Sequence, residues 1–255
     1  MYIHTVYRPQ EHVDHIEDWL KYHTAIGVNH FFLYDNGEST GYGENLNNLE
    51  WDRLLHTDQN SGITRYGFKI KHTVEKARLI EQEILAKYSV TKVNWKPSQN
   101  GKIIYGYNDS IRHLLTQVKT GLCAFIDIDE YIVKREEFRP SRMHQVRYED
   151  YHKFSSIFKC KNKLKTYNSV ELGPKCIVDL EKLKIDDELL YPNTMHFFST
   201  ELPLSTSHFN HYNFNKVAYR ELEKIHKGLP IYSNCFEYEE NPFKESIVDV
   251  TRIIK

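Results

Sequence analysis

The N-terminal part of the chain shows two kinds of hydrophobic periodicity. Residues 2–7 alternate enough between apolar and polar side chains to predict a strand. Apolar residues then recur at helical spacing through residues 13–26, and Gly27 is a natural end for that helix. Residues 31–34 form a second apolar strand, which ends at a turn signal over residues 35–37. A strand, a helix and a second strand in so short a stretch predict the start of a parallel sheet.

The same patterns recur along the rest of the chain, although they weaken after Val133. We expect further helices at 74–88, 107–118 and 215–226, and further strands at 91–95, 122–126, 170–179, 195–198 and 204–212. Residues 38–60 are polar and glycine-rich, which indicates an irregular excursion. No internal repeat or clear linker is visible, so the sequence predicts one α/β domain over residues 1–255.

The strand predicted at residues 122–126 is followed by Asp127, Asp129 and Glu130. Buried strands do not normally carry carboxylates, except at their ends, where the chain leaves the sheet. Ligands of open α/β sheets bind beyond the carboxyl ends of the strands. Two acids at positions i and i+2 can point to one side, which suits a divalent cation with a diphosphate attached. The alternative is a pair of solvated turn acids, because an Asp-x-Asp sequence often occurs by chance.

Composition sets broad limits on the class of protein. The chain has 255 residues, of which 40% are hydrophobic and 27% are charged, as is usual for a soluble protein with a sizeable core. The net charge of −1 does not favour binding to nucleic acid. The 18 Tyr and 13 Phe suit a protein that stacks bases or sugars, and a tyrosine-rich core explains them equally well.

Cysteine spacing and the N-terminus bear on the compartment. Four cysteines are present, none in a Cys-x-x-Cys arrangement, and we interpret them as reduced and structural rather than as disulfides: Cys123, Cys160, Cys176 and Cys235. The first residues do not have the design of a signal peptide, and no apolar run reaches membrane-spanning length. We expect a cytoplasmic protein, with peripheral association at the inner face of the membrane as one option. A luminal domain trimmed of its anchor is the alternative.

Six blocks of sequence stand out along the chain, and the fourth contains the Asp-x-Asp (DxD) motif: 15–23, 27–37, 107–110, 125–131, 173–178 and 208–212. In this order they together resemble glycosyltransferase family 92 and related family 2-like glycosyltransferases. The chain departs from the family pattern at the end of the first strand, where Tyr7-Arg8-Pro9-Gln10-Glu11 replaces the usual Lys-Asn-Glu. Residues 38–75 match no part of the pattern.

The resemblance implies a fold and a reaction. The fold is the GT-A fold, with a Rossmann-like, mostly parallel central sheet flanked by helices. Residues 1–133 would bind the nucleotide sugar, and residues 134–255 would form a smaller region on the acceptor side. The reaction is transfer of a sugar, with inversion, from a UDP-sugar to a hydroxyl of a glycan or glycolipid, as in polysaccharide biosynthesis. UDP-galactose is among the candidate donors, and Mn²⁺ or Mg²⁺ is the expected cofactor.

Three residues are the predicted metal ligands. A metal held by carboxylates can act as a Lewis acid and neutralise the departing diphosphate. Asp129 is the predicted direct ligand, whereas Asp127 contacts the ribose or reaches the metal through water. The family position makes His211 the remote third ligand. His196 is the competing choice, and both histidines could instead be structural.

Four further residues are candidates for binding the nucleotide. Asp35 ends the second strand, where its carboxylate can accept a hydrogen bond from uracil or ribose; the alternative is that it caps the turn that follows. Asn108 and Arg112 lie one helical turn apart, so one helix face could present both. Lys175 could offset phosphate charge, and a surface lysine is the alternative.

Inversion needs a base that takes the proton of the acceptor hydroxyl. The candidates follow the acidic strand in the chain, and Asp150 is slightly preferred over Glu149. Glu130 adjoins the metal-binding acids and could brace the site instead.

Two other functions remain open on the sequence. One is a metal-dependent nucleotidyl or phosphoryl transferase that uses the same acid pair, although no glycine-rich phosphate loop favours it. The other is a non-catalytic domain that binds a nucleotide or a carbohydrate.

Overall fold

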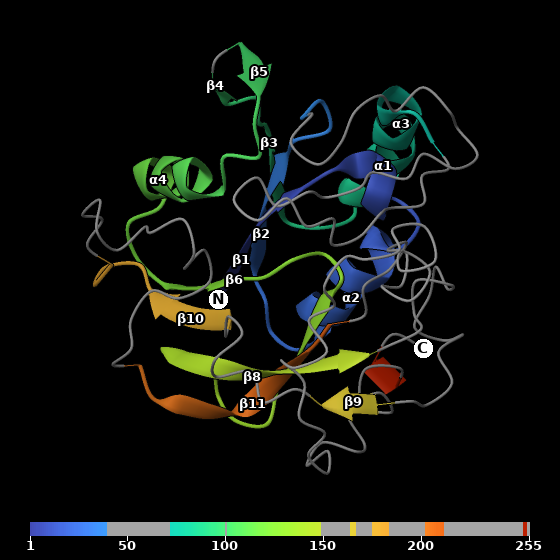
Figure 1. Ribbon diagram of the computed structural model, residues 1–255. Coiled ribbons are helices and arrows are strands. Elements are labelled where there is room, and N and C mark those ends of the chain that lie inside the picture. Colours follow the sequence, from blue (N-terminus) through green and yellow to red (C-terminus); the bar gives the residue numbers. More distant parts are fainter. Residues whose placement is uncertain are drawn as a thin grey trace, which may run out of the picture.

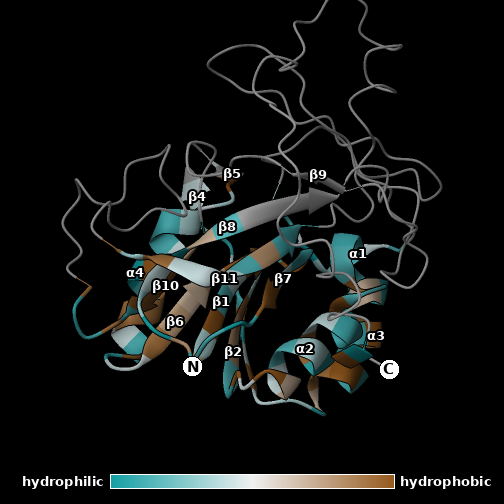
Figure 2. Cartoon of the chain, turned by 90° about the horizontal axis from the view of Figure 1, so that it is seen from below, coloured by the Kyte–Doolittle hydropathy of each residue, from teal (hydrophilic) through white to brown (hydrophobic). Residues whose placement is uncertain are grey.

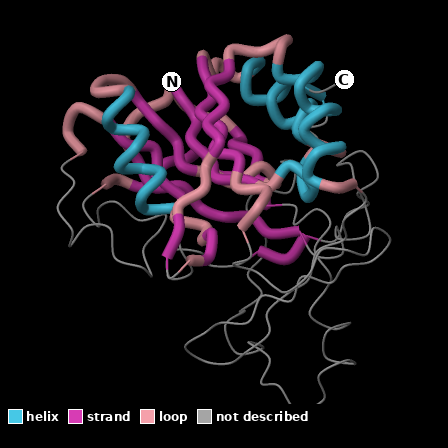
Figure 3. Tube along the Cα trace, turned by 90° about the horizontal axis from the view of Figure 1, so that it is seen from above, coloured by secondary structure: helices cyan, strands magenta, loops and turns pink. Residues whose placement is uncertain are grey.

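The computed structural model describes residues 1–39, 72–99, 101–148, 164–166, 175–183, 202–211 and 252–253. These residues form an α/β fold in which helices flank both faces of a nine-stranded sheet (Figures 1 and 3). The helices are α1 (Pro9–His12), α2 (Ile16–Ala25), α3 (Val74–Leu85) and α4 (Tyr107–Gln117). The strands of the sheet are β1 (Tyr2–Tyr7), β2 (His30–Asp35), β3 (Val90–Asn94), β6 (Leu122–Phe125), β7 (Glu130–Val133), β8 (Ser141–Tyr148), β9 (Leu164–Thr166), β10 (Lys175–Asp179) and β11 (Leu204–His211).

Most of the predicted elements in the described part of the chain are confirmed. The helix expected at 13–26 is α2, which begins only at Ile16 because His15 is outside helical geometry, with φ −138° and ψ 1°. The short helix α1, which has Pro9 in its first turn, was not expected. Gly27 follows α2 with φ +105°, a conformation that glycine adopts without strain. Strands β7, β8 and β9, and the small hairpin of β4 (Ser98–Gln99) and β5 (Lys102–Ile103), were not expected. The elements expected at 195–198 and 215–226, and the excursion at 38–60 except for its first two residues, lie outside the described residues.

The N-terminal half builds a parallel sheet in the order β3-β2-β1-β6. The chain runs outward from β1 to β3 and then returns to the other side of β1 to form β6. Because of this reversal, the carboxyl ends of the neighbouring strands β1 and β6 mark the topological switch point, where open α/β sheets bind their ligands. Figure 3 shows α4 on one side of the strands and α1, α2 and α3 on the other.

The second half of the chain makes the sheet mixed, which corrects the expectation of a mostly parallel sheet. The order continues from β6 through β10, β8 and β11 to β7, with β9 paired to β8. Strand β10 is antiparallel to both β6 and β8, and β11 is antiparallel to β7 but parallel to β8. Both sequence halves therefore contribute strands to one sheet.

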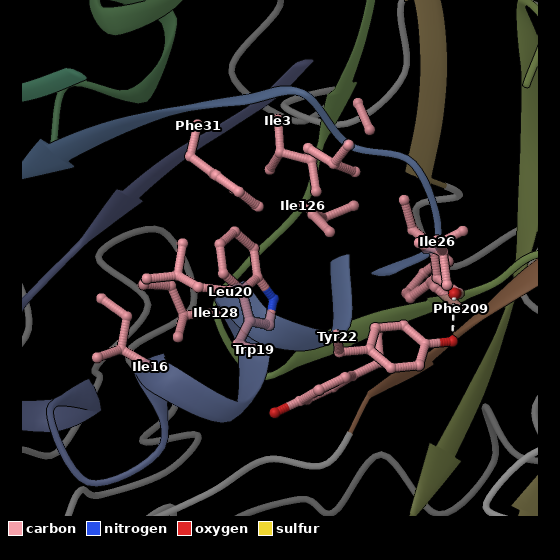
Figure 4. Close-up of a cluster of buried hydrophobic side chains, with 14 of the residues drawn as sticks. Ile3, Ile16, Trp19, Leu20, Tyr22, Ile26, Phe31, Ile126, Ile128 and Phe209 are labelled. Atoms are coloured by element: carbon pink, nitrogen blue, oxygen red, sulfur yellow. Dashed lines mark hydrogen bonds between the residues drawn. The ribbon is translucent and has the colours of Figure 1, made fainter. Parts of the chain in front are cut away.

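Alternation along the strands divides the core between the two faces. Ile3, Phe31 and Ile126 pack with Trp19 of α2 on one face (Figure 4). Val6, Tyr34 and Phe125, among others, pack with Ile111 and Leu114 of α4 on the other face. Figure 2 shows hydrophobic positions on α2 and α3 as well as on the strands. Strands β1, β2 and β6 are thus buried on both faces, as expected for parallel strands, whereas β3 at the edge of the sheet is largely exposed.

Helix α2 also covers the outer edge of β7. The indole of Trp19 donates to the carbonyl of Glu130 at 2.8 Å, and the Tyr22 hydroxyl donates to the carbonyl of Ile132 at 2.7 Å. The amide of Ile132 donates to Nε2 of His23 at 3.3 Å. Side chains of one helix therefore satisfy backbone groups that an exposed edge strand would leave unpaired.

Two further expectations can be compared with the described residues. Cys123 and Cys176 are buried and belong to no disulfide, as predicted, whereas Cys160 and Cys235 lie outside the described part of the chain. Within that part, no helix has both the length and the apolar character needed to cross a membrane. The assignment of residues 1–255 to a single domain stays a prediction.

Candidate functional site

Strand pairing brings four separate segments together beyond the carboxyl end of β6. Strand β6 ends at Phe125, Asp127 lies two residues further on, and Glu130 begins β7. Because β10 runs antiparallel to β6, its first residue, Lys175, lies at the end of β6 that carries Asp127. Because β11 is antiparallel to β7, its last residue, His211, pairs with Glu130. The register of two antiparallel pairs therefore assembles the site around the acidic run.

Lys175 bridges two carboxylates within this cluster. Its Nζ lies 3.0 Å from Oδ2 of Asp127 and 3.0 Å from Oε2 of Glu130. The same Glu130 oxygen accepts the backbone N–H of Asp127 at 2.8 Å, so Glu130 braces the turn that carries the acid pair. Lys175 is only 2% exposed, which excludes the alternative of a solvated surface lysine.

Asp129 faces a different partner. Its Oδ2 lies 3.3 Å from Nε2 of His211, and Nδ1 of the same imidazole lies 3.5 Å from Oε1 of Glu130. Asp129 and His211 are both buried. Two of the three predicted metal ligands thus meet, although they are far apart in the sequence. Asp127 differs from Asp129 because it is partly exposed and directs an oxygen to Lys175.

Burial controls the electrostatics of the cluster. Burial raises the pKa of Glu130 to about 8; Lys175 works against this shift, whereas the charges of Asp127 and Asp129 add to it. Burial disfavours the charge of Lys175, but the carboxylates of Asp127 and Glu130 outweigh it and raise the pKa of that lysine. The site therefore keeps a cation in a place that excludes water.

The described residues contain no group of three or more His, Cys, Asp or Glu side chains arranged to hold a metal ion. In this arrangement Asp129 and His211 form a two-residue set, and Asp127 belongs to the lysine side of the cluster. The remaining choice for a ligand, His196, lies outside the described residues.

Asp35 lies at the carboxyl end of β2, as predicted, and its carboxylate is occupied by protein groups. Arg78 of α3 donates from Nε to Oδ2 at 2.7 Å and from Nη2 to Oδ1 at 2.9 Å. Lys92 of β3 lies 3.0 Å from Oδ2, and the amide of Gly37 donates to Oδ1 at 3.0 Å. The turn-capping role is therefore present, and the contact with a nucleoside stays a prediction.

Asn108 and Arg112 both lie on α4, the helix that packs on the sheet face formed by Val6, Tyr34 and Phe125. Arg112 is partly exposed and pairs with Asp109 through Nη1 and Oδ1 at 2.9 Å. Their predicted contact with the nucleotide is untested by this arrangement. Glu149 and Asp150, the candidate bases, lie outside the described residues.

Sequence reasoning missed two arginines near these strand ends. Arg78 holds Asp35, and Arg8 follows β1 directly at the switch point, where it is 2% exposed. A charged residue immediately after the first predicted strand was a visible signal for Arg8. Arg78 carried no such signal, because its position on α3 opposite Asp35 depends on helix packing.

In comparisons with known proteins, no protein-family model, curated protein or solved structure matches this chain.

Proposed function

We propose that the chain is a metal-dependent glycosyltransferase, which moves a sugar from a UDP-sugar to a hydroxyl of a glycan acceptor with inversion. One observation carries the proposal: Asp129 and His211 meet at 3.3 Å beyond the carboxyl end of β6, beside a buried lysine. This edge of an α/β sheet is where nucleotide ligands are bound. Its groups offer both a metal site and a cation for a diphosphate.

The carboxylate and imidazole fit a hard divalent cation in type and spacing. Carboxylate oxygen is a ligand for both Mn²⁺ and Mg²⁺, whereas an imidazole nitrogen is better suited to Mn²⁺ than to Mg²⁺. Two neighbouring ligands of an octahedral ion, with bonds of about 2.1 Å, lie roughly 3 Å apart. The separation of 3.3 Å between Asp129 and His211 is close to that value. Asp129 and His211 would therefore hold the metal, and Asp127 would contact it only through water or bind the ribose.

Such a metal, when bound, supplies Lewis-acid stabilisation of the diphosphate leaving group. Lys175 contributes a second positive charge that solvent does not screen, because it is buried beside Asp127. The Oε2 oxygen of Glu130 holds both the ammonium group of Lys175 and the backbone amide of Asp127. The chain thereby positions positive charge where negative charge develops on the departing diphosphate. Removal of the acceptor proton is assigned to Asp150 or Glu149, as the sequence predicts.

Binding of UDP with and without Mn²⁺ tests the metal assignment. The variants Asp129→Asn and His211→Ala should each lose the Mn²⁺-dependent part of UDP affinity and the release of UDP from a UDP-sugar. Glu137→Gln is a suitable control, because Glu137 is 94% exposed and pairs only at the surface with Lys134. Unchanged Mn²⁺ dependence in both site variants would reject the metal site.

Product analysis tests the reaction class. Wild-type protein incubated with a panel of UDP-sugars, Mn²⁺ and glycan acceptors should release UDP and form a glycosidic bond. Release of pyrophosphate or transfer of a phosphoryl group would favour the nucleotidyl or phosphoryl transferase. Tight UDP-sugar binding without any turnover would indicate a binding domain.

A further inference from the structure

Arg8 occupies an unusual position for a charged residue. It follows β1 directly, between the strand ends that lead to Asp35 and Asp127, and its backbone remains extended with φ −115° and ψ 116°. It immediately precedes α1, and charged residues are rarely buried in full unless they are paired. Arg8 is nevertheless only 2% exposed. A guanidinium is thus buried at the switch point of the sheet.

Only part of this guanidinium has a partner. Its Nη1 donates to Oε1 of Glu11 at 2.5 Å. Its Nε and Nη2 are buried and have no hydrogen-bond acceptor among the described residues. Buried donors without acceptors carry the full cost of their lost hydration, and this cost is largest for charged groups. The arrangement is therefore incomplete without another group.

The two unused nitrogens share one edge of the guanidinium. Their N–H bonds are parallel and form the fork that binds two oxygens of a carboxylate or phosphate. Arg78 uses the same pair of nitrogens in this protein, donating from Nε and Nη2 to the two oxygens of Asp35. Arg78 has its oxyanion within the chain, whereas the equivalent edge of Arg8 has none among the described residues.

We propose that the Nε and Nη2 edge of Arg8 binds a phosphate group of the donor's diphosphate. The inference rests on the proposed function for the identity of the ligand, and on the unfilled fork for the site itself. The fork selects an oxyanion, and its place at the carboxyl end of β1 selects a nucleotide phosphate over other oxyanions. Arg8 and Lys175 then supply cations from β1 and β10, the strand ends on either side of β6.

Binding measurements with pyrophosphate, UDP and uridine test the assignment. The variant Arg8→Lys keeps the positive charge but loses the fork, so affinity for pyrophosphate and UDP should fall roughly tenfold or more. Affinity for uridine should stay as in the wild type. Arg139→Lys is the matched control, because Arg139 is 53% exposed and pairs with Glu136 at the surface. It should change none of the three affinities.

A second measurement does not depend on folding of the variant. The Nε–H resonance of Arg8 in ¹⁵N-labelled wild-type protein should shift on titration with pyrophosphate, because the anion becomes its acceptor. Absence of a shift at saturation overturns the proposal, as does Arg8→Lys binding pyrophosphate and UDP like the wild type. Failure of the wild type to bind either anion overturns it too.

The outcomes separate this site from the function proposed above. Arg8-dependent binding of pyrophosphate together with no sugar transfer from any donor supports the anion site and rejects the transferase. Sugar transfer together with an unchanged Arg8→Lys affinity rejects the anion site and leaves the transferase in place.

Discussion

Lys175 shows how a single side chain can hold a site together. It is buried between Asp127 and Glu130, at 3.0 Å from an oxygen of each. A buried ion pair gains little over an apolar pair, but the loss of one member leaves an uncompensated charge. The stability of this region should therefore depend on keeping the lysine and its carboxylates together.

The variant Lys175→Met should destabilise the fold in a pH-dependent way. Lys175 holds down the pKa of Glu130, so its removal raises that pKa further. Above pH 8 the variant must either keep Glu130 protonated or bury its charge unpaired, and we expect a loss of about 3–5 kcal/mol in the free energy of unfolding relative to the wild type. The loss should be smaller at pH 6, because Glu130, with a pKa already raised to about 8, then stays protonated. Urea denaturation at both pH values measures this difference.

A control and a double variant make this test specific. Lys182 is 82% exposed, and Lys182→Met should change stability by less than about 0.5 kcal/mol. Adding Glu130→Gln to Lys175→Met should recover part of the loss at high pH, because the unpaired acid is then absent. Equal losses at pH 6 and above pH 8 would contradict the assigned role of Glu130.

At the scale of elements, the site depends on how two strands begin and end. Gly121 leads into β6 with φ +101°, and its carbonyl accepts the amide of Leu180 at 2.9 Å, which links β6 to the end of β10. Strand β7 is held on its outer edge by side chains of α2. The acid pair lies between these two strands, so both contacts fix its position.

Two glycines with similar backbone angles allow a matched comparison. Gly27 has φ +105° and Gly121 has φ +101°. A Cβ at position 27 would lie 3.9 Å from the ring of Phe138, whereas a Cβ at position 121 would lie 2.9 Å from the ring of Tyr2. Both alanine variants should lose about 1–3 kcal/mol through backbone strain, and Gly121→Ala should lose about 1 kcal/mol more. Thermal unfolding measures both, and equal losses would show that Tyr2 moves away freely.

The hydrogen bonds from α2 to the edge of β7 make a separate prediction. Tyr22→Phe removes the donor to the buried carbonyl of Ile132 without removing the ring. We expect a loss of about 1–2 kcal/mol in unfolding free energy. Hydrogen exchange should also speed up at the amides of β7. Tyr88→Phe, at a partly exposed tyrosine, is the control and should have little effect; a similar loss in both variants would argue against a special role for the edge.

At the scale of the whole molecule, three buried histidines couple stability to pH. Burial lowers the pKa of His4, His23 and His208 to about 3 in each case. His4 lies on β1, whereas His23 of α2 and His208 of β11 both flank β7. His23 shows how the neutral form is fixed: its Nδ1 faces the carbonyl of Trp19 at 2.9 Å, and its Nε2 accepts the amide of Ile132.

Acid should therefore unfold the protein cooperatively. The unfolded chain binds a proton on each histidine near pH 6.5, whereas the folded state does so only near pH 3, so stability is lost as the pH falls between these values. Each histidine should contribute a loss of about 1.6 kcal/mol between pH 6.5 and pH 5. Denaturant unfolding across this range measures the slope. The variant His23→Gln can still donate and accept hydrogen bonds but does not titrate, so the slope of unfolding free energy against pH should fall by the equivalent of about one proton. An unchanged slope would contradict the burial of His23 in its neutral form.

Local patterns were sufficient for much of the fold. The alternation of residues 2–7 and the helical spacing in α2, α3 and α4 are visible in the sequence, because burial on a fixed face imposes a period on each element. The acids at 127 and 129 could be placed at a strand end for the same reason. Strand β8 escaped notice because its sequence, SRMHQVRY, has little apolar alternation.

The sequence by itself determined the strongly periodic elements and the acids that follow β6, since these depend on neighbours along the chain. Only the tertiary structure decided what those acids meet. The antiparallel insertion of β10 beside β6 buries Lys175 against Asp127, and the pairing of β11 with β7 brings His211 to Asp129. The same is true of the salt bridge between Asp35 and Arg78. Strand order and register arise from contacts between distant segments, and periodicity within one segment does not encode them.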